Sequence, residues 1–329
     1  MRNGMILVTG GAGFIGSNLI AALEARGQTV AVCDRLGQGE KWRNLAKRAL
    51  AAVVEPEGLG EFLAEKRGQI AAIFHLGAVS ATTERDVDLI LRTNFTLSER
   101  LWDWSAEHGA RFFYASSAAV YGDGKAGYDD DPAALARLRP LNPYGWSKLL
   151  FDRRVQQLTS GQAPRPPQWA GFRFFNVYGP NEYHKGAMRS VVKQVHERLS
   201  AGEPALLFRS HDPAYPDGGQ LRDFVAVGDC VDAMLWLYDH PETSGVFNLG
   251  TGKARSFAEL ARAVAAALGR EAAIRYVDTP AELRQHYQYF TEAETARLRR
   301  VGYDRPFTGL EDGVQHYVKD YLSAADPYL

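Results

Sequence analysis

Residues 5–16, MILVTGGAGFIG, carry the strongest structural signal in the chain. Met5–Thr9 is a short run of strand-forming apolar residues, and a helical pattern begins at Phe14. The glycines between them have the GxxGxxG spacing. The first permits a tight turn, the second lets backbone approach a pyrophosphate, and the third lets the helix pack on the strand. The free N–H groups of the helix's first turn can bind phosphates. The residues predicted to line this dinucleotide site are Gly10, Gly13, Phe14, Ile15 and Gly16.

The alternation of strand and helix continues outward from this turn. Strand-like runs occur at 29–33, 71–75, 111–115 and 169–174. Helical patterns separate strands in this way when the sheet is parallel and the crossovers are right-handed. The fold class predicted is therefore α/β, with a doubly wound parallel Rossmann-type sheet. Residues 1–175 are expected to form the dinucleotide-binding domain.

The pattern changes after residue 175. Shorter helices and strands are predicted at 187–201, near Leu206 and Arg222, and at 229–239, 246–249 and 256–268. We interpret residues 176–329 as a smaller C-terminal α/β substrate-binding domain. The two domains are expected to be interleaved, with a strand and a helix near 226–255 returning to the first. The Gly-, Pro- and Asp-rich stretches at 122–132, 163–168 and 211–220 are predicted loops.

The composition argues against several kinds of partner. The 329 residues carry a formal net charge of −1, so neither nucleic acid nor an anionic membrane surface is expected as a partner. No segment reaches the roughly 18 consecutive apolar residues of a membrane span. The only cysteines, Cys33 and Cys230, lie far apart in the sequence, which favours a reducing compartment and a cytoplasmic protein. No metal site is predicted.

The choice of dinucleotide depends on the end of the second strand-like run. Asp34 stands where an acid binds the adenosine ribose hydroxyls of NAD. Arg35 and Lys41 follow it, and either cation could neutralise the 2′-phosphate of NADP. Solvated loop cations are the alternative interpretation of both. NADP is the cofactor expected, with NAD as the alternative.

Tyr144 and Lys148 form a YxxxK motif. Residues at i and i+4 project from one face of a helix. A nearby ammonium lowers the pKa of a phenol, which can then accept a proton from an alcohol. Ser117 follows a predicted strand at the sheet edge where ligands bind, and its hydroxyl can hydrogen-bond the reacting oxygen. For Ser117, a capping role is the alternative.

The glycine turn, the serine after a strand and YxxxK occur in the order seen in extended short-chain dehydrogenases/reductases. The chain resembles this superfamily, which includes the NAD-dependent epimerases and dehydratases, over nearly its whole length. Further matches are HLGA at 75–78, Asn94, NVYGP at 176–180 and RDFV at 222–225. Besides Tyr144 and Lys148, the resemblance implies cofactor contacts from Leu76, Gly77, Ala78, Ser80, Asn94 and Val177. It assigns Arg222 to a nucleotide diphosphate, and the fork of a guanidinium suits phosphate oxygens.

The dehydratases of this superfamily carry Asp-Glu after the active hydroxyl, where this chain has Ala118-Ala119, so dehydration is not expected. Several stretches, including HKG at 184–186 and QYFT at 288–291, are instead similar to the ADP-glycero-manno-heptose 6-epimerases. That similarity implies a nucleotide sugar, ADP-heptose, epimerised at C6″ by transient oxidation with NADP for lipopolysaccharide core synthesis. It assigns acid/base catalysis to Tyr144 and Lys185. It also implies a homo-oligomer, which is a pentamer in that family.

The resemblance also implies a set of substrate contacts from both parts of the chain. They are Ser80, Ser117, Asn176, Lys185, Phe208, Arg222 and Tyr287. For Lys185 the alternative is an exposed polar loop, and for Tyr287 it is an aromatic core position.

Three features depart from the pattern of the heptose epimerases. Ala187 stands at a serine position, the loop 211–220 is longer than expected, and Arg35 replaces a smaller polar residue. An epimerase or reductase of another nucleotide sugar therefore stays an alternative. A second alternative is a non-catalytic cofactor-binding protein, although a pure binder has no need of Tyr144. His184 is expected only to shape its loop.

Overall fold

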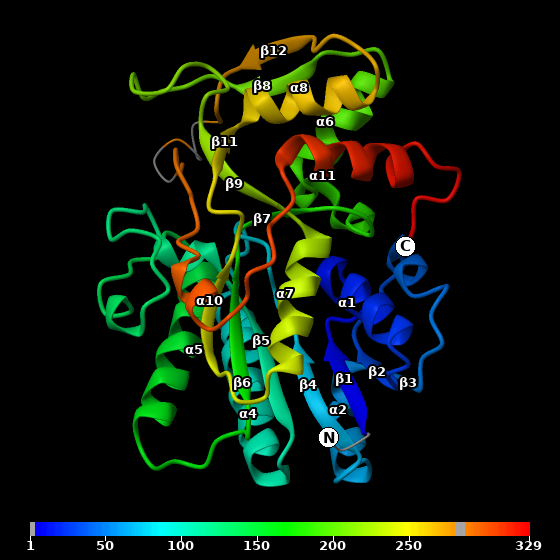
Figure 1. The fold of residues 1–329 in the computed structure, drawn as a ribbon, viewed down its shortest axis with the longest axis vertical. Helices are drawn as coiled ribbons and strands as arrows, with labels where there is room; N and C mark the ends of the chain where they lie inside the picture. Colours follow the sequence, from blue (N-terminus) through cyan, green and yellow to red (C-terminus); the bar gives the residue numbers. More distant parts are fainter. Residues whose placement is uncertain (1–3, 281–283, 285–286) are drawn as a thin grey trace.

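Seven parallel strands form the central sheet, in the order β10-β6-β5-β4-β1-β2-β3 (Figure 1). The computed structural model describes residues 4–280, 284 and 287–329. The strands of this sheet are β1 (Met5–Thr9), β2 (Val30–Cys33), β3 (Ala52–Val54), β4 (Ile70–His75), β5 (Arg111–Ser117), β6 (Trp169–Phe174) and β10 (Gly245–Leu249). The strand order reverses between β1 and β4, and ligands of such sheets bind outside the carboxyl ends at that point. The predicted fold class is confirmed.

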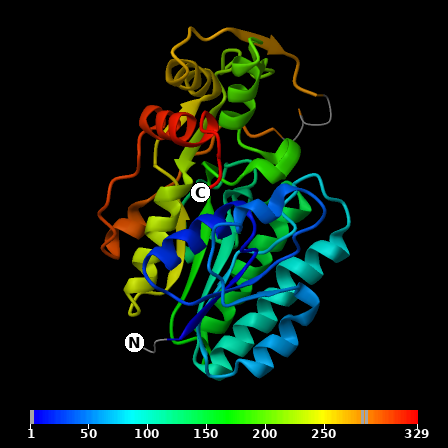
Figure 2. The same cartoon turned by 90° about the vertical axis from the view of Figure 1, so that its right-hand side faces the viewer.

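Helices cover both faces of this sheet (Figure 2). One layer contains α1 (Phe14–Ala25) and α7 (Val227–Asp239). The other contains α2 (Leu59–Glu65), α4 (Leu97–His108) and α5 (Pro143–Ser160). Because successive strand residues point to opposite faces, Ile6 and Val8 pack in the layer of α1, whereas Leu7 packs in the layer of α2.

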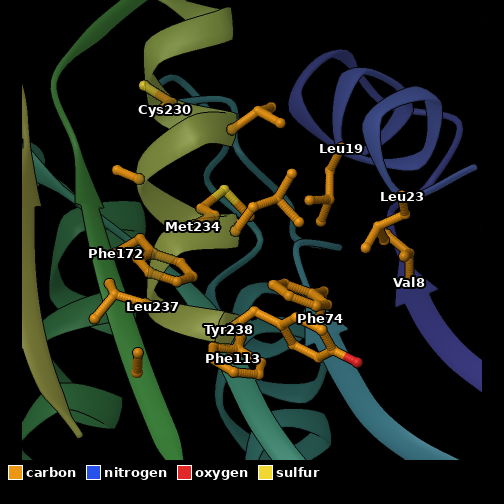
Figure 3. Packing of buried hydrophobic residues seen from close by; sticks show 14 of the residues in the cluster. Val8, Leu19, Leu23, Phe74, Phe113, Phe172, Cys230, Met234, Leu237 and Tyr238 are labelled. Atoms are coloured by element: carbon orange, nitrogen blue, oxygen red, sulfur yellow. The ribbon is translucent and has the colours of Figure 1, made fainter. Parts of the chain in front are cut away.

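The core under α1 and α7 is built from aliphatic helix residues and aromatic strand residues (Figure 3). Leu19 of α1 and Met234 of α7 point into the same space above the sheet. Phe74 of β4 and Phe113 of β5 stack there with ring centroids 4.5 Å apart. A parallel sheet buried on both faces requires nearly continuous apolar strands, and this accounts for the apolar runs in the sequence.

A smaller body caps the carboxyl end of the sheet (Figure 1). Its strands are β7 (Asn176–Tyr178), β8 (Ala205–Phe208), β9 (Leu221–Ala226), β11 (Ala254–Ser256) and β12 (Ile274–Val277). Its helices are α6 (Val191–Ser200), α8 (Phe257–Ala267) and α11 (Leu310–Tyr317). They share one core with residues of β8 and β9. The chain crosses back between the bodies, since α7 and β10 follow β9 but pack with the large sheet.

Short helical segments make many of the remaining connections. They are η1 (Glu40–Asn44), η2 (Pro56–Gly58), α3 (Val87–Ile90), η3 (Leu91–Thr96), η4 (Ala118–Tyr121), η5 (Pro132–Ala134), η6 (Tyr183–Met188), α10 (Ala296–Arg300) and η7 (Val318–Leu322). Among the helices of the described residues, none combines the length and apolar character that a membrane crossing requires.

The structure differs from the sequence-based elements in a few places. The strands β3 and β12 were not predicted, because each is short and lacks full burial on either face. The helix predicted to begin near Ala187 begins at Val191 instead. Gly186 has a φ of 54° and interrupts the helical backbone, and the Ser190 hydroxyl caps the new start by accepting from the Lys193 N–H at 3.3 Å.

A buried ion pair joins the sheet to α5. Arg173 on β6 and Asp152 on α5 are 0% and 1% exposed, and the Arg173 Nε donates to Asp152 Oδ2 at 3.0 Å. Asp152 also accepts from the Tyr114 hydroxyl at 3.1 Å and from the Ser116 hydroxyl at 3.0 Å. Donors on β5 and β6 therefore bind both carboxylate oxygens of Asp152. The pair therefore holds the face of α5 that carries YxxxK against the sheet.

We expect Arg173→Met to lower the free energy of unfolding by about 3–5 kcal/mol, because Asp152 would stay buried without its partner. Urea denaturation followed by circular dichroism measures the change. The double variant Asp152→Asn/Arg173→Met should recover part of the loss, since it removes the isolated charge. A loss of less than about 1 kcal/mol in the single variant would contradict a structural role for this pair.

Candidate active site

The glycine turn is packed too tightly for side chains. Gly10 has a φ of +67°, and a Cβ placed on it would lie 2.5 Å from the backbone nitrogen of Gly77. A Cβ on Gly16 would lie 2.3 Å from the carbonyl oxygen of Gly10. The turn therefore needs glycine to bring α1 against the end of β1. The first turn of α1 carries no acidic residue, so its N-terminus fits a pyrophosphate.

The end of β4 lies directly against this turn. Leu76, Gly77 and Ala78 are half-buried there, and Gly77 makes the close approach to Gly10. The His75 ring is hydrogen-bonded on both sides. Its Nδ1 lies 2.7 Å from Thr9 Oγ1, and its Nε2 lies 2.9 Å from the Ser98 hydroxyl oxygen. Burial lowers the pKa of His75 to about 3, so the ring is neutral. Its role here is to fix the ends of the two strands that form the crevice.

Asn94 links the β4 loop to the helix of YxxxK. Its amide accepts from the Val79 N–H at 2.8 Å, donates to the Val79 carbonyl at 3.0 Å and donates to the Ser147 hydroxyl at 3.0 Å. Ser147 in turn donates to the carbonyl of Tyr144 at 2.7 Å. The side chain of Asn94 thus connects two walls of the crevice. Ser80, just beyond Val79, is exposed at its rim.

Asp34 lies at the end of β2, beside the glycine turn. Its Oδ2 accepts from the Ala12 N–H at 2.9 Å, and its Oδ1 accepts from the Arg35 N–H at 2.7 Å and from Lys41 Nζ at 2.6 Å. The Arg35 guanidinium is more exposed and forms an ion pair with Glu57. Of the two predicted cations, Lys41 therefore neutralises the carboxylate directly, whereas the Arg35 guanidinium pairs with Glu57.

Ser117, Tyr144 and Lys148 meet where β5 ends and α5 begins. Asn142 caps α5, so Tyr144 lies in its first turn and Lys148 one turn later. Burial raises the pKa of Tyr144, and a hydrogen bond with the Ser117 side chain partly offsets this effect. Burial lowers the pKa of Lys148 to about 8, and the nearby Asp152 carboxylate opposes the decrease. The sequence-based prediction of a lowered phenol pKa is therefore wrong for this structure, because desolvation outweighs any effect of the ammonium.

Lys185 approaches the site from a different element. It lies in η6, and its ammonium is 5.5 Å from the centre of the Phe14 ring at the start of α1. Burial lowers the pKa of Lys185, and the Glu182 carboxylate opposes the decrease. His184, the preceding residue, accepts from the side-chain amide of Asn44 at 3.2 Å. The HKG turn thus sits over the cofactor turn.

Arg222 lies apart from these groups, in the capping body. It is 8% exposed on β9, and its guanidinium carbon is 5.3 Å from the centre of the Tyr287 ring and 5.6 Å from that of Phe257. Phe208 at the end of β8 packs edge-on against Tyr287, with centroids 6.2 Å apart. These side chains form an aromatic enclosure around one cation.

The predicted loop 211–220 lies beside this enclosure. The ring of Tyr215 packs 5.3 Å from that of Tyr289, which is itself 5.3 Å from that of Tyr287. Asn176 and Val177 lie on β7, at the junction of the two bodies, with Asn176 exposed and Val177 half-buried. The predicted substrate contacts are therefore distributed along the boundary between the large sheet and its cap.

Comparison with known proteins identifies the family. The sequence model of the NAD dependent epimerase/dehydratase family matches residues 6–250. The chain belongs to this family. It is therefore an enzyme of a group that uses a nicotinamide dinucleotide, and the superfamily resemblance inferred from the sequence is confirmed.

Curated relatives within this epimerase family align over almost the whole chain. A protein of Nitratidesulfovibrio vulgaris (strain DP4) named ADP-L-glycero-D-manno-heptose-6-epimerase is 48% identical, over 99% of this chain and 100% of its own. A protein of the same name from Fusobacterium nucleatum subsp. nucleatum is 42% identical, over 99% and 100%.

Solved structures of the family have the same fold. The ADP-L-glycero-D-manno-heptose-6-epimerase of Helicobacter pylori superposes with a TM-score of 0.81 at 29% identity, covering 98% of this chain and 100% of its own. The UDP-glucose 4-epimerase of Thermus thermophilus, solved in complex with NAD, superposes with a TM-score of 0.76 at 28% identity, covering 98% and 100%.

Two residues of this epimerase site were missed or undervalued from the sequence. Asn44 is 2% exposed, and its amide lies 2.9 Å from the carbonyl of Ala12 and 3.2 Å from His184 Nδ1. Burial, Lys41 and Lys185 together lower the pKa of His184 to about 4. Asn44 and His184 are 140 residues apart, so no local pattern could have paired them.

We expect Gly16→Ala to weaken binding of the nicotinamide cofactor at least about tenfold, because the carbonyl of Gly10 must move away from the new methyl group. Isothermal titration of cofactor-free protein measures the affinity. Gly60→Ala is the matched control, because a Cβ there meets no atom within 4 Å. Equal affinities in the two variants would show that the close packing of the turn does not govern binding.

Proposed function

We propose that this chain is a cytoplasmic ADP-heptose 6-epimerase, converting ADP-D-glycero-manno-heptose to ADP-L-glycero-manno-heptose with NADP, for lipopolysaccharide core synthesis. The observation that carries the proposal is the presence of two half-buried acid/base groups, Tyr144 and Lys185, on elements from different parts of the chain. The names of the relatives that align from end to end support this choice of sugar nucleotide.

Tyr144 serves as the first acid/base group. The nicotinamide of a bound dinucleotide supplies the chemistry of taking a hydride from the sugar carbon and returning it. Tyr144, once it has lost its own proton and stands as the phenolate, accepts the proton of the reacting alcohol, and Ser117 holds the same alcohol oxygen by hydrogen bonding. Lys148 has a pKa of about 8, so it can be charged or neutral near neutral pH and can compensate the charge that develops on the phenol.

Lys185 serves as the second acid/base group. Inverting one carbon requires proton transfer at its oxygen in two orientations of the ketone-level intermediate. After the intermediate turns, its oxygen faces away from Tyr144, and a second group on another wall of the pocket can reach it. The lowered pKa of Lys185 favours an amine able to exchange a proton near neutral pH.

The remaining substrate groups bind the nucleotide away from the reacting carbon. Arg222 suits the diphosphate because its guanidinium is already held among aromatic rings, which limits the entropy lost on binding. Phe208 and Tyr287 supply apolar surface for the nucleoside. We assign Ser80 and Asn176 to sugar hydroxyls at the rim of the crevice.

The proposal that the cofactor is NADP is supported by the surroundings of Asp34. An unpaired carboxylate there would accept the ribose hydroxyls of NAD and repel a 2′-phosphate. Here Lys41 pairs with it at 2.6 Å, and two backbone N–H groups occupy its oxygens. The neutralised acid, with Arg35 beside it, favours the phosphorylated ribose.

We propose that the two parts of the chain bind different ligands. Residues 1–175, joined by the strand and helix near 226–255, bind the dinucleotide, and the rest of 176–329 binds the sugar nucleotide. We also propose a homo-oligomer. The resemblance to the heptose epimerases suggests that it is a pentamer.

We expect Tyr144→Phe and Lys185→Met each to reduce epimerisation of ADP-heptose about a hundredfold or more while cofactor stays bound, because each removes one proton-transfer group. Proton NMR of the product mixture measures epimerisation, and an aldehyde analogue at the C6 level tests the half-reaction. Each variant should retain some dismutation of this analogue. Normal epimerisation by Lys185→Met would refute the two-base assignment, and absence of turnover by the wild type would refute the choice of sugar.

We expect NADP to bind more tightly than NAD, and Arg35→Ala to weaken NADP about tenfold without affecting NAD, because only NADP offers a 2′-phosphate to the guanidinium. Fluorescence titration of cofactor-free protein gives the four affinities. Lys66→Ala is a suitable control, since Lys66 is also a surface cation with an acidic partner, Glu65. Tighter binding of NAD to the wild type would show that Asp34 dominates the choice.

A further inference from the structure

The turn that carries Lys185 is attached to the cofactor turn on one side. The Asn181 amide donates to the Ser17 hydroxyl of α1 at 3.0 Å. Lys185 itself lies over the Phe14 ring. On the far side of Lys185, Gly186 has a φ of +54° and its Cβ position meets no atom within 4 Å. Beyond it, the Ser190 hydroxyl donates to Glu182 Oε1 at 2.6 Å, so the turn is held at both of its ends.

A second attachment comes from residues 326–329, here called the 326–329 segment. The Tyr183 hydroxyl donates to the carbonyl of Pro327 at 2.7 Å, and its ring packs edge-on against that of Tyr328 with centroids 5.1 Å apart. The Leu329 N–H donates to Asn181 Oδ1 at 3.0 Å. The chain is exposed from 323 to 326, yet Tyr328 is only 8% exposed. The segment is thus docked onto the Lys185 turn.

The same segment also reaches the part of the chain around η1. Lys47 Nζ donates to the carbonyl of Tyr328 at 2.6 Å and pairs with Asp326 at 2.9 Å. The Arg43 guanidinium lies 4.5 Å from the centre of the Tyr328 ring. In Figures 1 and 2 the chain runs from α11 toward the body of the large sheet, and its end lies beside that body. The 326–329 segment therefore bridges the Lys185 turn and the stretch that contains Lys41.

We propose that Tyr328 is a positioning residue, which holds the Lys185 turn against the cofactor turn and so keeps the dinucleotide bound while Lys185 acts. This inference rests on the proposed acid/base role of Lys185. The ring of Tyr328 lies between Tyr183 and Arg43, so one side chain joins the two flanks of the cofactor crevice. Its removal takes away the contact that joins the turn to Arg43, while the Ser190–Glu182 hydrogen bond remains.

Loss of Tyr328 has two expected effects, on the retention of the bound dinucleotide and on the position of Lys185. A dinucleotide bound at the glycine turn would be released more readily if the HKG turn separated from η1, where Asn44 contacts His184. Without Tyr328, that separation costs less, and release is faster. Lys185 also samples positions away from the sugar oxygen, which lowers the limiting rate more than it changes substrate affinity.

The test compares Tyr328→Ala with the wild type as holoprotein. We expect release of the bound nicotinamide dinucleotide, followed without sugar substrate by trapping it with an auxiliary dehydrogenase, to be about tenfold faster, and kcat to fall about tenfold with little change in KM. Tyr328→Phe keeps the ring and should restore both. The release assay needs no sugar nucleotide, so it reports on the attachment even if the proposed substrate is wrong.

Arg26→Ala is the matched control, because it removes a surface contact with Asp239 away from the site. Release no faster in Tyr328→Ala than in Arg26→Ala would overturn the proposal. If Tyr328→Ala does not fold, Lys47→Ala replaces it, since its half-exposed side chain can be removed with little risk to folding. Lys47→Ala should accelerate release about threefold, and an unchanged rate would equally overturn the proposal.

Discussion

The close approach of Gly10 to Gly77 and of Gly16 to Gly10 is the constraint on which the site depends. Neither approach leaves room for a Cβ, since the nearest backbone atoms lie 2.5 and 2.3 Å from its ideal positions. Only with both contacts can the N-terminus of α1 aim at the crevice between β1 and β4. The ends of these two strands are then held together by the neutral His75 ring, through Thr9. The turn proposed to bind the cofactor and the junction of β1 with β4 therefore depend on the same close backbone contacts.

The YxxxK helix α5 is fixed to that framework by buried polar contacts. Asp152 and Arg173 form a fully buried pair one turn beyond Lys148, and Asn94 ties Ser147 to the β4 loop. Burial has opposite effects on the two ends of the YxxxK motif, raising the pKa of Tyr144 and lowering that of Lys148. Both shifts favour the neutral form, because desolvation penalises whichever form is charged. The helix thus presents a neutral phenol one turn before an amine whose pKa is about 8.

The cap contributes through segments that cross to the large sheet rather than through a separate binding surface. Pro180 accepts from the Asn18 amide of α1 at 2.9 Å, directly before the turn with Lys185. Arg222 and its aromatic neighbours Tyr287 and Phe257 belong to the cap. The chain returns to the sheet with α7 and β10 before it completes the cap. The candidate site residues therefore come from at least three separate stretches of the chain.

The α/β class, the glycine turn and the YxxxK helix could be predicted from the sequence, because they depend on short-range spacing: a glycine every third residue, strand-length apolar runs and an i, i+4 pair. The same spacing placed Asp34 and Ser117 at strand ends. The raised pKa of Tyr144 became evident only in the folded chain, because burial depends on what packs over a residue rather than on its neighbours in sequence. The tertiary structure also decided the contact of Asn44 with His184 and the docking of Tyr328 on Tyr183, which join residues 140 positions apart or more. Such contacts have no periodicity to reveal them, since they form only after the sheet and its cap have brought distant loops together.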